Sequence, residues 1–332
     1  MRETEIDDLA RRLAAGERRA LARAITLAES TRPDHRAATR RLLQRIGPGS
    51  GGAIRIGLSG TPGVGKSTFI EAFGCMLVEQ GLKVAVLAVD PSSARSGGSI
   101  LGDKTRMERL ARSANAFIRP SPARSELGGV GRRTREAIRL VESAGFDVVL
   151  VETVGVGQSE VMVAEMTDIF VLLLAPAGGD ELQGVKRGIM EIADLVVVNK
   201  ADGALKPVAE ATRSDYAGAL RLMRKRQRDP EGFPAAITAS ALKGEGLTEV
   251  WEKVSALDKW RRESGWFARH RAEQAVRWMR SAVEHGVVAM LYAHPAVAAL
   301  LPELEAQVAS GEVAPEDAAD RVLALFKGAN PG

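Results

Sequence analysis

The feature that most limits the folds open to this chain is one glycine-rich stretch, Gly60-Thr61-Pro62-Gly63-Val64-Gly65-Lys66-Ser67. It fits the pattern G-x-x-x-x-G-K-[ST] at every fixed position. The apolar run 54–59 before it predicts a strand, and residues 68–80 after it predict a helix that ends at Gly81. A strand, a glycine loop and a helix in this order form a cradle at which backbone N–H groups and the positive helix end meet phosphate groups.

Within this cradle we expect Lys66 to reach the β- and γ-phosphates, and the hydroxyl of Ser67 to bind Mg²⁺. The glycines let the backbone approach the phosphates closely. The residues predicted to surround the phosphates are Gly60, Pro62, Gly63, Val64, Gly65, Lys66, Ser67 and Thr68.

From residue 53 to about residue 250, apolar strand-like runs alternate with helical patterns. Continuous runs of Val, Leu and Ile are typical of strands buried on both faces. They predict an α/β fold, a P-loop NTPase with a mostly parallel central sheet and helices on each side. The predicted strands are 54–59, 83–89, 116–118 (the weakest), 147–152, 169–174, 194–198 and 235–239.

Helical extensions are predicted at both ends of the P-loop domain, which we place at residues 51–255. Residues 1–50 form an arginine-rich N-terminal extension in which Pro33 separates two helical pieces. Residues 256–332 form a C-terminal arm, and the large apolar residues in it favour a dimer interface over packing against the chain's own domain. The helices predicted near and within the arm are 251–264, 266–285, 296–309 and 315–327, and Pro295, Pro302 and Pro315 punctuate them.

Composition limits the kinds of partner and the cell compartment expected for this chain. A net charge of +4 on 332 residues is mild and indicates neither nucleic-acid nor membrane binding. The single cysteine, Cys75, excludes an intramolecular disulfide and fits a reducing compartment. Because no apolar run approaches the roughly 18 residues of a membrane span and the N-terminus has no signal-peptide pattern, we expect a cytoplasmic protein.

A second motif, Asn199-Lys200-Ala201-Asp202, follows the predicted strand 194–198 and points to guanine. Guanine presents an N1–H group and an amino group side by side, and the carboxylate of Asp202 can accept from both, whereas adenine lacks that pair. We expect Asn199 to tie its loop to the P-loop, and the stem of Lys200 to cover the base. After the last strand, in Ser240-Ala241-Leu242, the backbone N–H of Ala241 is expected to donate to guanine O6.

Three acids are candidates for Mg²⁺ and catalysis, either directly or through water. Asp90 ends the second predicted strand, and Glu152 ends another, three residues before the γ-phosphate-sensing candidate Gly155. Asp103 lies in a segment that could order around the γ-phosphate. With Lys66, these acids form the predicted catalytic set. Val156 stands where many small GTPases carry a water-orienting Gln, so we expect intrinsic turnover on the order of 10⁻³ s⁻¹ or less, which a partner could stimulate.

Taken together, these stretches resemble the MeaB/ArgK family of P-loop GTPases, in the G3E class. The resemblance rests on the P-loop, on Asp90-Pro91-Ser92-Ser93, on the distinctive segment 97–107, on Glu152-Thr153-Val154-Gly155 and on Asn199-Lys200-Ala201-Asp202. It implies GTP/GDP and Mg²⁺ as ligands, and a homodimer held by the C-terminal arm. It also implies methylmalonyl-CoA mutase, an adenosylcobalamin enzyme, as the partner that this chain would load and protect.

The resemblance further implies that residues 177–188 form a third switch that responds to the mutase, with Asp180, Gln183 and Lys186 as candidate switch residues. From the residues alone, this loop is a glycine-rich helix start, with its acids favourable near the helix N-terminus.

Three other functions stay open from the sequence. A GTP-dependent metallochaperone calls for a Cys/His cluster, whereas this chain has one cysteine and four scattered histidines. A transport-linked kinase or ATPase is disfavoured by Asp202. A binding module whose nucleotide is only structural is the third.

Overall fold

The computed structural model describes residues 1–47, 52–89, 107–120, 127–153, 159–176, 187–223 and 229–328. By contacts within the chain, it divides into two compact units, Met1–Gln274 and Ala275–Gly332. The first unit holds the sheet and the N-terminal helices. The second is helical.

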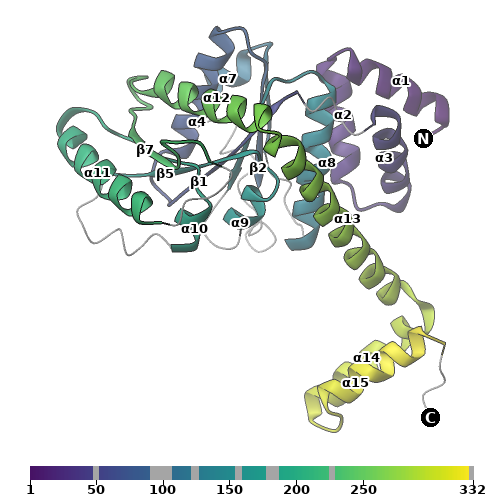
Figure 1. The fold of residues 1–332 in the computed structure, drawn as a ribbon. Helices are drawn as coiled ribbons and strands as arrows, with labels where there is room; N and C mark the ends of the chain where they lie inside the picture. Colours follow the sequence, from purple (N-terminus) through teal and green to yellow (C-terminus); the bar gives the residue numbers. More distant parts are fainter. Residues whose placement is uncertain are drawn as a thin grey trace. The chain divides into compact units, whose positions relative to one another are not determined.

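Seven parallel strands form one sheet in the order β3-β2-β4-β1-β5-β6-β7 (Figure 1). This confirms the α/β P-loop architecture, and each of the seven predicted segments forms a strand, including the weakest candidate. The strands are β1 Ile54–Gly60, β2 Val84–Val89, β3 Ala116–Arg119, β4 Val148–Thr153, β5 Ile169–Leu174, β6 Leu195–Val198 and β7 Ala235–Thr238.

β1 lies inside the sheet, paired with β4 on one side and β5 on the other. Ile54 is level with Val148, and Ile56 is level with Ile169. Because the strands are parallel, their carboxyl ends meet at one edge, where open α/β sheets bind ligands. The loop that follows β1 therefore opens at the centre of that edge.

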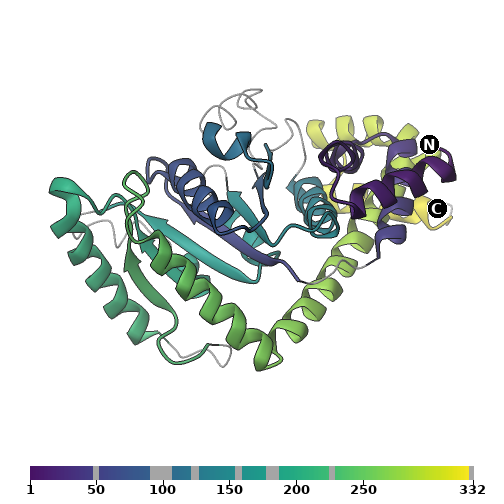
Figure 2. The same ribbon diagram turned by 90° about the horizontal axis from the view of Figure 1, so that it is seen from above.

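The two faces of β1 pack against different helices. Ile56 and Leu58 are buried in a core that includes residues of α4 (Lys66–Glu79) and α12 (Leu247–Glu263), which lie over the sheet on the side facing the viewer in Figure 2. Gly57 points the other way, where a Cβ atom would lie 2.9 Å from Val163 Cγ1 on α9 (Ser159–Ala164). α9 thus packs directly on the strand that leads into the P-loop. The other helices of the sheet domain are α7 Glu108–Arg112, α8 Leu127–Ser143, α10 Arg187–Ile192 and α11 Lys206–Leu222, with a 3₁₀ turn, η2, at Gly203–Leu205.

The N-terminal extension consists of three helices that pack on each other and on α8 (Figure 1). Pro33 begins the third helix, as expected, but a further break at Gly16, in the left-handed region at φ +75°, divides the first piece in two. Arg36 joins the extension to α8 through two bonds to Glu136, of 2.7 and 2.8 Å. The helices are α1 Glu3–Ala14, α2 Arg18–Glu29 and α3 Pro33–Ile46.

Three helices follow α12. Pro295 and Pro315 stand in the first turns of their helices, where the missing N–H costs nothing, and Pro302 lies inside its helix, as it does in the predicted segment 296–309. In the described part of the chain no single helix is long and apolar enough to span a membrane. One pair of helices, bent by 80° between them, meets the length and composition criteria only when taken together. The helices are α13 Trp266–Ala293, α14 Pro295–Ser310 and α15 Pro315–Phe326.

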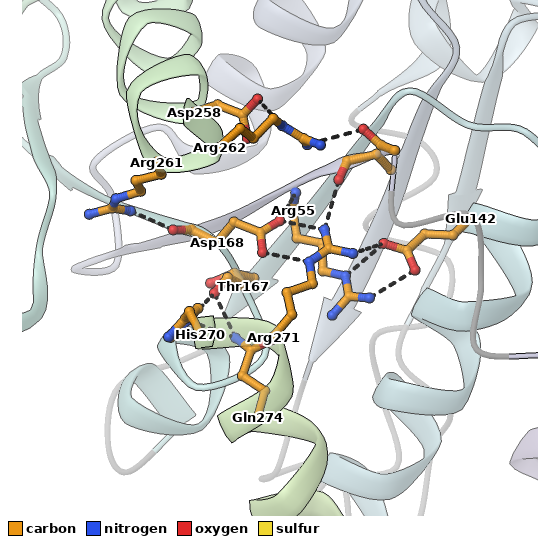
Figure 3. A network of polar contacts seen from close by, with 12 residues as sticks. Arg55, Glu142, Thr167, Asp168, Asp258, Arg261, Arg262, His270, Arg271 and Gln274 are labelled. Carbon is orange, nitrogen blue, oxygen red and sulfur yellow. Dashed lines mark hydrogen bonds and ion pairs between the residues drawn. The ribbon is translucent and has the colours of Figure 1, made fainter. Parts of the chain in front are cut away.

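A buried ionic network fastens the first turns of α13 to the sheet at the edge opposite the P-loop (Figure 3). Arg271 donates to both carboxylate oxygens of Asp168, at 2.7 and 2.9 Å, and to Glu142 at 3.0 Å. Arg55, near the start of β1, donates twice to the same Glu142, at 2.7 and 2.8 Å. The side chains of Glu142 and Asp168 are 0% and 1% exposed, so each carboxylate depends on its arginines. Arg261, 1% exposed, likewise pairs with Asp194.

Candidate nucleotide-binding site

Two glycines of the P-loop take backbone conformations that favour glycine. Gly63 and Gly65 lie in the left-handed region, at φ +83° and +89°, which only glycine adopts readily. α4 begins at Lys66, directly after Gly65. The first N–H groups of a helix have no partner within it, so the amides at the start of α4 are available to an anion at the carboxyl edge of the sheet.

At two positions of the P-loop, neighbouring atoms lie so close to the backbone that only glycine fits. A Cβ atom on Gly60 would lie 2.4 Å from the carbonyl oxygen of Leu173 on β5. A Cβ atom on Gly65 would lie 2.9 Å from Nδ2 of Asn199, in the loop after β6. The P-loop is therefore pressed against its neighbours on the β5–β6 side, and any larger residue at either position would displace it.

Lys66 is the cation of this loop. Its ammonium donates to the carbonyl oxygen of Gly60 at 2.6 Å, which folds the side chain back along the cradle. Burial lowers the pKa of Lys66, and the charges of Glu152 and Glu160 act in the opposite direction. The negative charges of Glu152 and Glu160 thus favour the charged form of this half-buried lysine.

The residues described here fit a hydrated Mg²⁺ ion, which prefers oxygen ligands. Ser67 brings a hydroxyl in the first turn of α4, and Glu152, only 2% exposed, brings a carboxylate at the end of the neighbouring β4. Beside Glu152, Thr153 donates to Ser59 at 3.1 Å and joins the carboxyl ends of β4 and β1. The other predicted metal and switch residues, Asp90, Asp103, Gly155, Asp180, Gln183 and Lys186, lie outside the described residues.

Asn199 joins the loops after β6 and β7 to the P-loop. Its Nδ2 donates to the carbonyl oxygen of Val64 at 2.9 Å, and its Oδ1 accepts from the N–H of Ala241 at 3.0 Å. We expected that N–H to meet guanine O6; in this structure Asn199 engages it instead. The side-chain amide has both a donor and an acceptor to satisfy in a site where it is 2% exposed, and these two bonds do so.

Asp202 is oriented by Ser240, whose hydroxyl donates to Oδ1 at 2.7 Å. Ser240 is fully buried, so this bond fixes one carboxylate oxygen and leaves acceptor positions for two donors of a base. Lys200, at φ +62°, donates to the carbonyl oxygen of Gly63 at 2.6 Å, which lays its stem across the space between the two loops. Leu242 is 80% exposed beside them.

Comparison with known proteins agrees with this geometry. Residues 21–296 match the sequence model of the family described as methylmalonyl-CoA mutase-associated GTPase MeaB. The chain belongs to the MeaB family.

Curated relatives of the MeaB family align along nearly the whole chain. A protein of Caulobacter vibrioides is 56% identical over 322 residues, 97% of this chain and 98% of the relative. GTPase ArgK of Escherichia coli is 49% identical over 88% of each chain. A mouse protein named methylmalonic aciduria type A homolog, mitochondrial, is 49% identical over 97% of this chain and 80% of its own length.

A solved structure extends the likeness to the fold. The crystal structure of a protein described as LAO/AO transport system kinase superposes with a TM-score of 0.75 at 38% identity, covering 98% of this chain and 99% of that one. The chain is thus a GTPase of the MeaB family with the family fold, and GTP and GDP are its nucleotides.

The structure also buries an acid at the start of α9 that the sequence analysis does not single out. Glu160 is 4% exposed in the first turn of α9, and its charge acts on Lys66. The sequence gives one signal for it, an acid at the start of a helix that follows a nucleotide-binding loop. An acid in that place is usually a helix cap, so the signal carries little weight.

Proposed function

We propose that this GTPase is a chaperone of an adenosylcobalamin-dependent methylmalonyl-CoA mutase, which binds and hydrolyses GTP to gate loading of the cofactor and to protect the mutase from inactivation. The family description names the mutase, and the mouse relative is named after methylmalonic aciduria. The observation that carries the nucleotide part is the buried Asn199, which joins the P-loop to the loops of Asp202 and Ala241. A change at the γ-phosphate can reach the base-binding loops through it.

In the proposed reaction, water attacks the γ-phosphorus in line with the bond to the β-phosphate oxygen, which breaks to give GDP and phosphate. Lys66 turns from the Gly60 carbonyl to the β- and γ-oxygens and stabilises the charge that develops there. Mg²⁺, held by Ser67 with Glu152, Asp90 and Asp103, would neutralise phosphate charge. The N–H groups at the start of α4 bind the β-phosphate.

We propose further that the protein is cytoplasmic and works as a homodimer through α13. Seven large apolar side chains on that helix are 46–65% exposed, and five of them recur at intervals of three or four residues: Val276, Met279, Val283, Val287 and Met290. Spacing of this kind forms one stripe along a helix. A second copy of the same helix presents a matching stripe, which supports a dimer contact here.

GTP turnover by the purified protein, alone and with saturating methylmalonyl-CoA mutase, tests the proposal. We expect slow turnover alone and a large acceleration with the mutase, with ATP ineffective in both cases. The Lys66→Ala variant is the control for contaminating phosphatase and should lose turnover under both conditions. Unchanged turnover with the mutase would remove it as the client. Tight ATP binding would favour the kinase function that the name of the solved relative suggests.

A further inference from the structure

A cavity of about 690 Å³ borders β3, the strand at one end of the sheet, and shares no residue with the nucleotide site. Its other walls are α2, from the N-terminal extension, and α7. Cavities of about 300–1,000 Å³ suit small molecules, whereas a protein partner needs a much larger surface. The charged side chains in the walls are four arginines and one glutamate: Arg18, Arg19, Glu108, Arg112 and Arg119.

Arg18 is held in one orientation by main-chain carbonyls beside β3. Its Nη1 donates to the carbonyl oxygens of Ala116 and Ser113, at 2.5 and 3.2 Å. Both N–H groups of Nη1 are thereby used, and no described residue accepts from Nε or Nη2. Arg55 binds both oxygens of Glu142 through its own Nε and Nη2, at 2.7 and 2.8 Å. The same edge of Arg18 can bind an oxyanion in this bidentate way.

The positive charge of the cavity is only partly neutralised. Two of the four arginines are paired with carboxylates, Arg119 with Glu29 at 2.8 Å and Arg112 with Glu108 at 3.3 Å. The other two, both on α2, bond to no carboxylate in the described part of the chain. Carbonyl oxygens are neutral, so they orient a guanidinium without cancelling its charge. The cavity therefore has two positive charges in excess.

The first turn of α2 contains Arg18 and Arg19 but no acid. The positive end of a helix favours negative side chains, so two cations there are unfavourable unless an anion compensates them. The preceding acid, Glu17, is bonded through both oxygens to Arg12, at 2.5 and 2.6 Å, and does not line the cavity. An anion in the cavity would supply the missing negative charge.

We propose that this cavity binds the phosphate group of a small phosphorylated molecule. A phosphate monoester carries a charge of about −1.5 to −2 at pH 7, which matches the two arginines without a carboxylate. Arg18 donates to two phosphate oxygens from Nε and Nη2, and Arg19 adds the second charge. Ala22, Ala111 and Ile118 also line the cavity and contact the carbon part of the molecule. The inference goes beyond the proposed function and depends on neither GTP nor the mutase.

The test measures binding of phenyl phosphate by calorimetry to the full chain saturated with GDP, so that the nucleotide site is occupied. Three comparison ligands separate the contributions. Inorganic phosphate lacks the ring, benzoate has the ring with a single charge, and an acidic hexapeptide represents a protein partner. We expect saturable binding of phenyl phosphate with a Kd below about 1 mM, and binding of each comparison ligand to be at least about threefold weaker.

Arg18→Gln should weaken phenyl phosphate binding at least about tenfold, because a bidentate charge-assisted contact is lost. Arg19→Gln should weaken it by about three- to tenfold. The matched control is Arg23→Gln, which removes the same charge from an exposed position on α2 outside the cavity. It should bind within about twofold of wild type, and GDP affinity should be unchanged in all three variants. Since Arg18 also holds β3, Arg19→Gln carries the test if Arg18→Gln does not fold.

Three results would overturn the proposal. The first is no saturable binding of phenyl phosphate up to about 10 mM. The second is an equal loss in Arg19→Gln and Arg23→Gln, which would mark a response to net charge alone. The third is tighter binding of any comparison ligand than of phenyl phosphate. If that ligand is the hexapeptide, the cavity belongs to an acidic protein segment instead.

Discussion

We expect Asp202 to set the choice of base through the acceptor positions that its bond from Ser240 leaves open. In Asp202→Asn, one acceptor becomes an N–H₂ donor, which faces the guanine amino group but complements the C2 carbonyl of xanthine. One charge-assisted bond to guanine is lost and the other becomes a bond to a neutral amide, so we expect GDP affinity to fall on the order of 10²-fold and XDP affinity to rise. Calorimetry with both nucleotides measures this. Asp215→Asn, an exposed position on α11, is the control and should change neither affinity.

Substitution of Asn199 is expected to lower both the stability of the protein and its affinity for nucleotide. Asn199→Ala leaves the carbonyl of Val64 and the N–H of Ala241 without their partner in a buried site. We expect the free energy of unfolding to fall by about 2–4 kcal/mol and GDP to dissociate faster. Urea titration and stopped-flow release of a fluorescent GDP measure the two effects. Asn115→Ala, away from the P-loop, should show neither, and a variant with normal release would mean that the junction does not hold the loops.

At the scale of elements, the network of Figure 3 predicts a defect in stability that spares the nucleotide. Arg271→Ala leaves Glu142 and Asp168 buried with one arginine fewer. We expect the free energy of unfolding to fall by about 3–5 kcal/mol, the usual cost of breaking a buried ion pair. GDP affinity should be unchanged, because the P-loop lies at the other edge of the sheet. Arg269→Ala, which is exposed, is the control for loss of a positive charge on α13. A large change in GDP affinity would show that the two edges are coupled.

The same network has a defined pH dependence. Burial raises the pKa of Asp168, but the nearby Arg271 and Arg55 outweigh it and hold the pKa below its usual value of 3.8. A lowered carboxyl pKa stabilises the fold above the unfolded-state value, and that contribution is lost as the pH falls. In Arg271→Ala, burial raises the pKa of Asp168 with only Arg55 of these two arginines left to lower it. The difference in unfolding free energy between wild type and variant should therefore be largest at neutral pH and shrink below about pH 4. A difference that stays constant with pH would contradict the assigned role of Asp168.

The sequence predicts some elements better than others. Elements with a strong signal in neighbouring residues are easy to predict, whereas features that depend on one residue or on distant contacts are not. Strands such as 169–174 are evident because burial on both faces makes every residue apolar. The break at Gly16 was missed because a single glycine within a helical pattern is a weak signal.

The nucleotide site shows the same division. Its motifs are contiguous, so the P-loop and residues 199–202 could be found by spacing alone. The burial of Glu160 and the pairing of Arg271 with Glu142 could not, because both depend on residues far away in sequence and no local pattern records them. The use of the Ala241 N–H by Asn199 was missed for a similar reason, since it depends on the relative position of two loops.

For the whole molecule, the exposed stripe on α13 predicts the oligomeric state. Val283→Glu places a charge in the middle of the stripe, and burying it in a dimer would be costly. We expect the dimer to weaken on the order of 10²-fold while each protomer still binds GDP. Sedimentation velocity over a range of concentrations measures this. Ala289→Glu adds the same charge on another face of α13 and should leave the dimer intact; equal effects of both variants would place the contact elsewhere.

The central position of β1 also has a consequence for synthesis of the chain. β1 emerges from the ribosome early, but its neighbours β4 and β5 begin at Val148 and Ile169, about a hundred residues later. Pairing over such separations is slow because long loops must close first. β1 therefore cannot pair with both neighbours, and part of its apolar surface stays uncovered, until translation has passed Leu174. During that interval it depends on helices such as α4, or on cellular holdases, to stay out of aggregates.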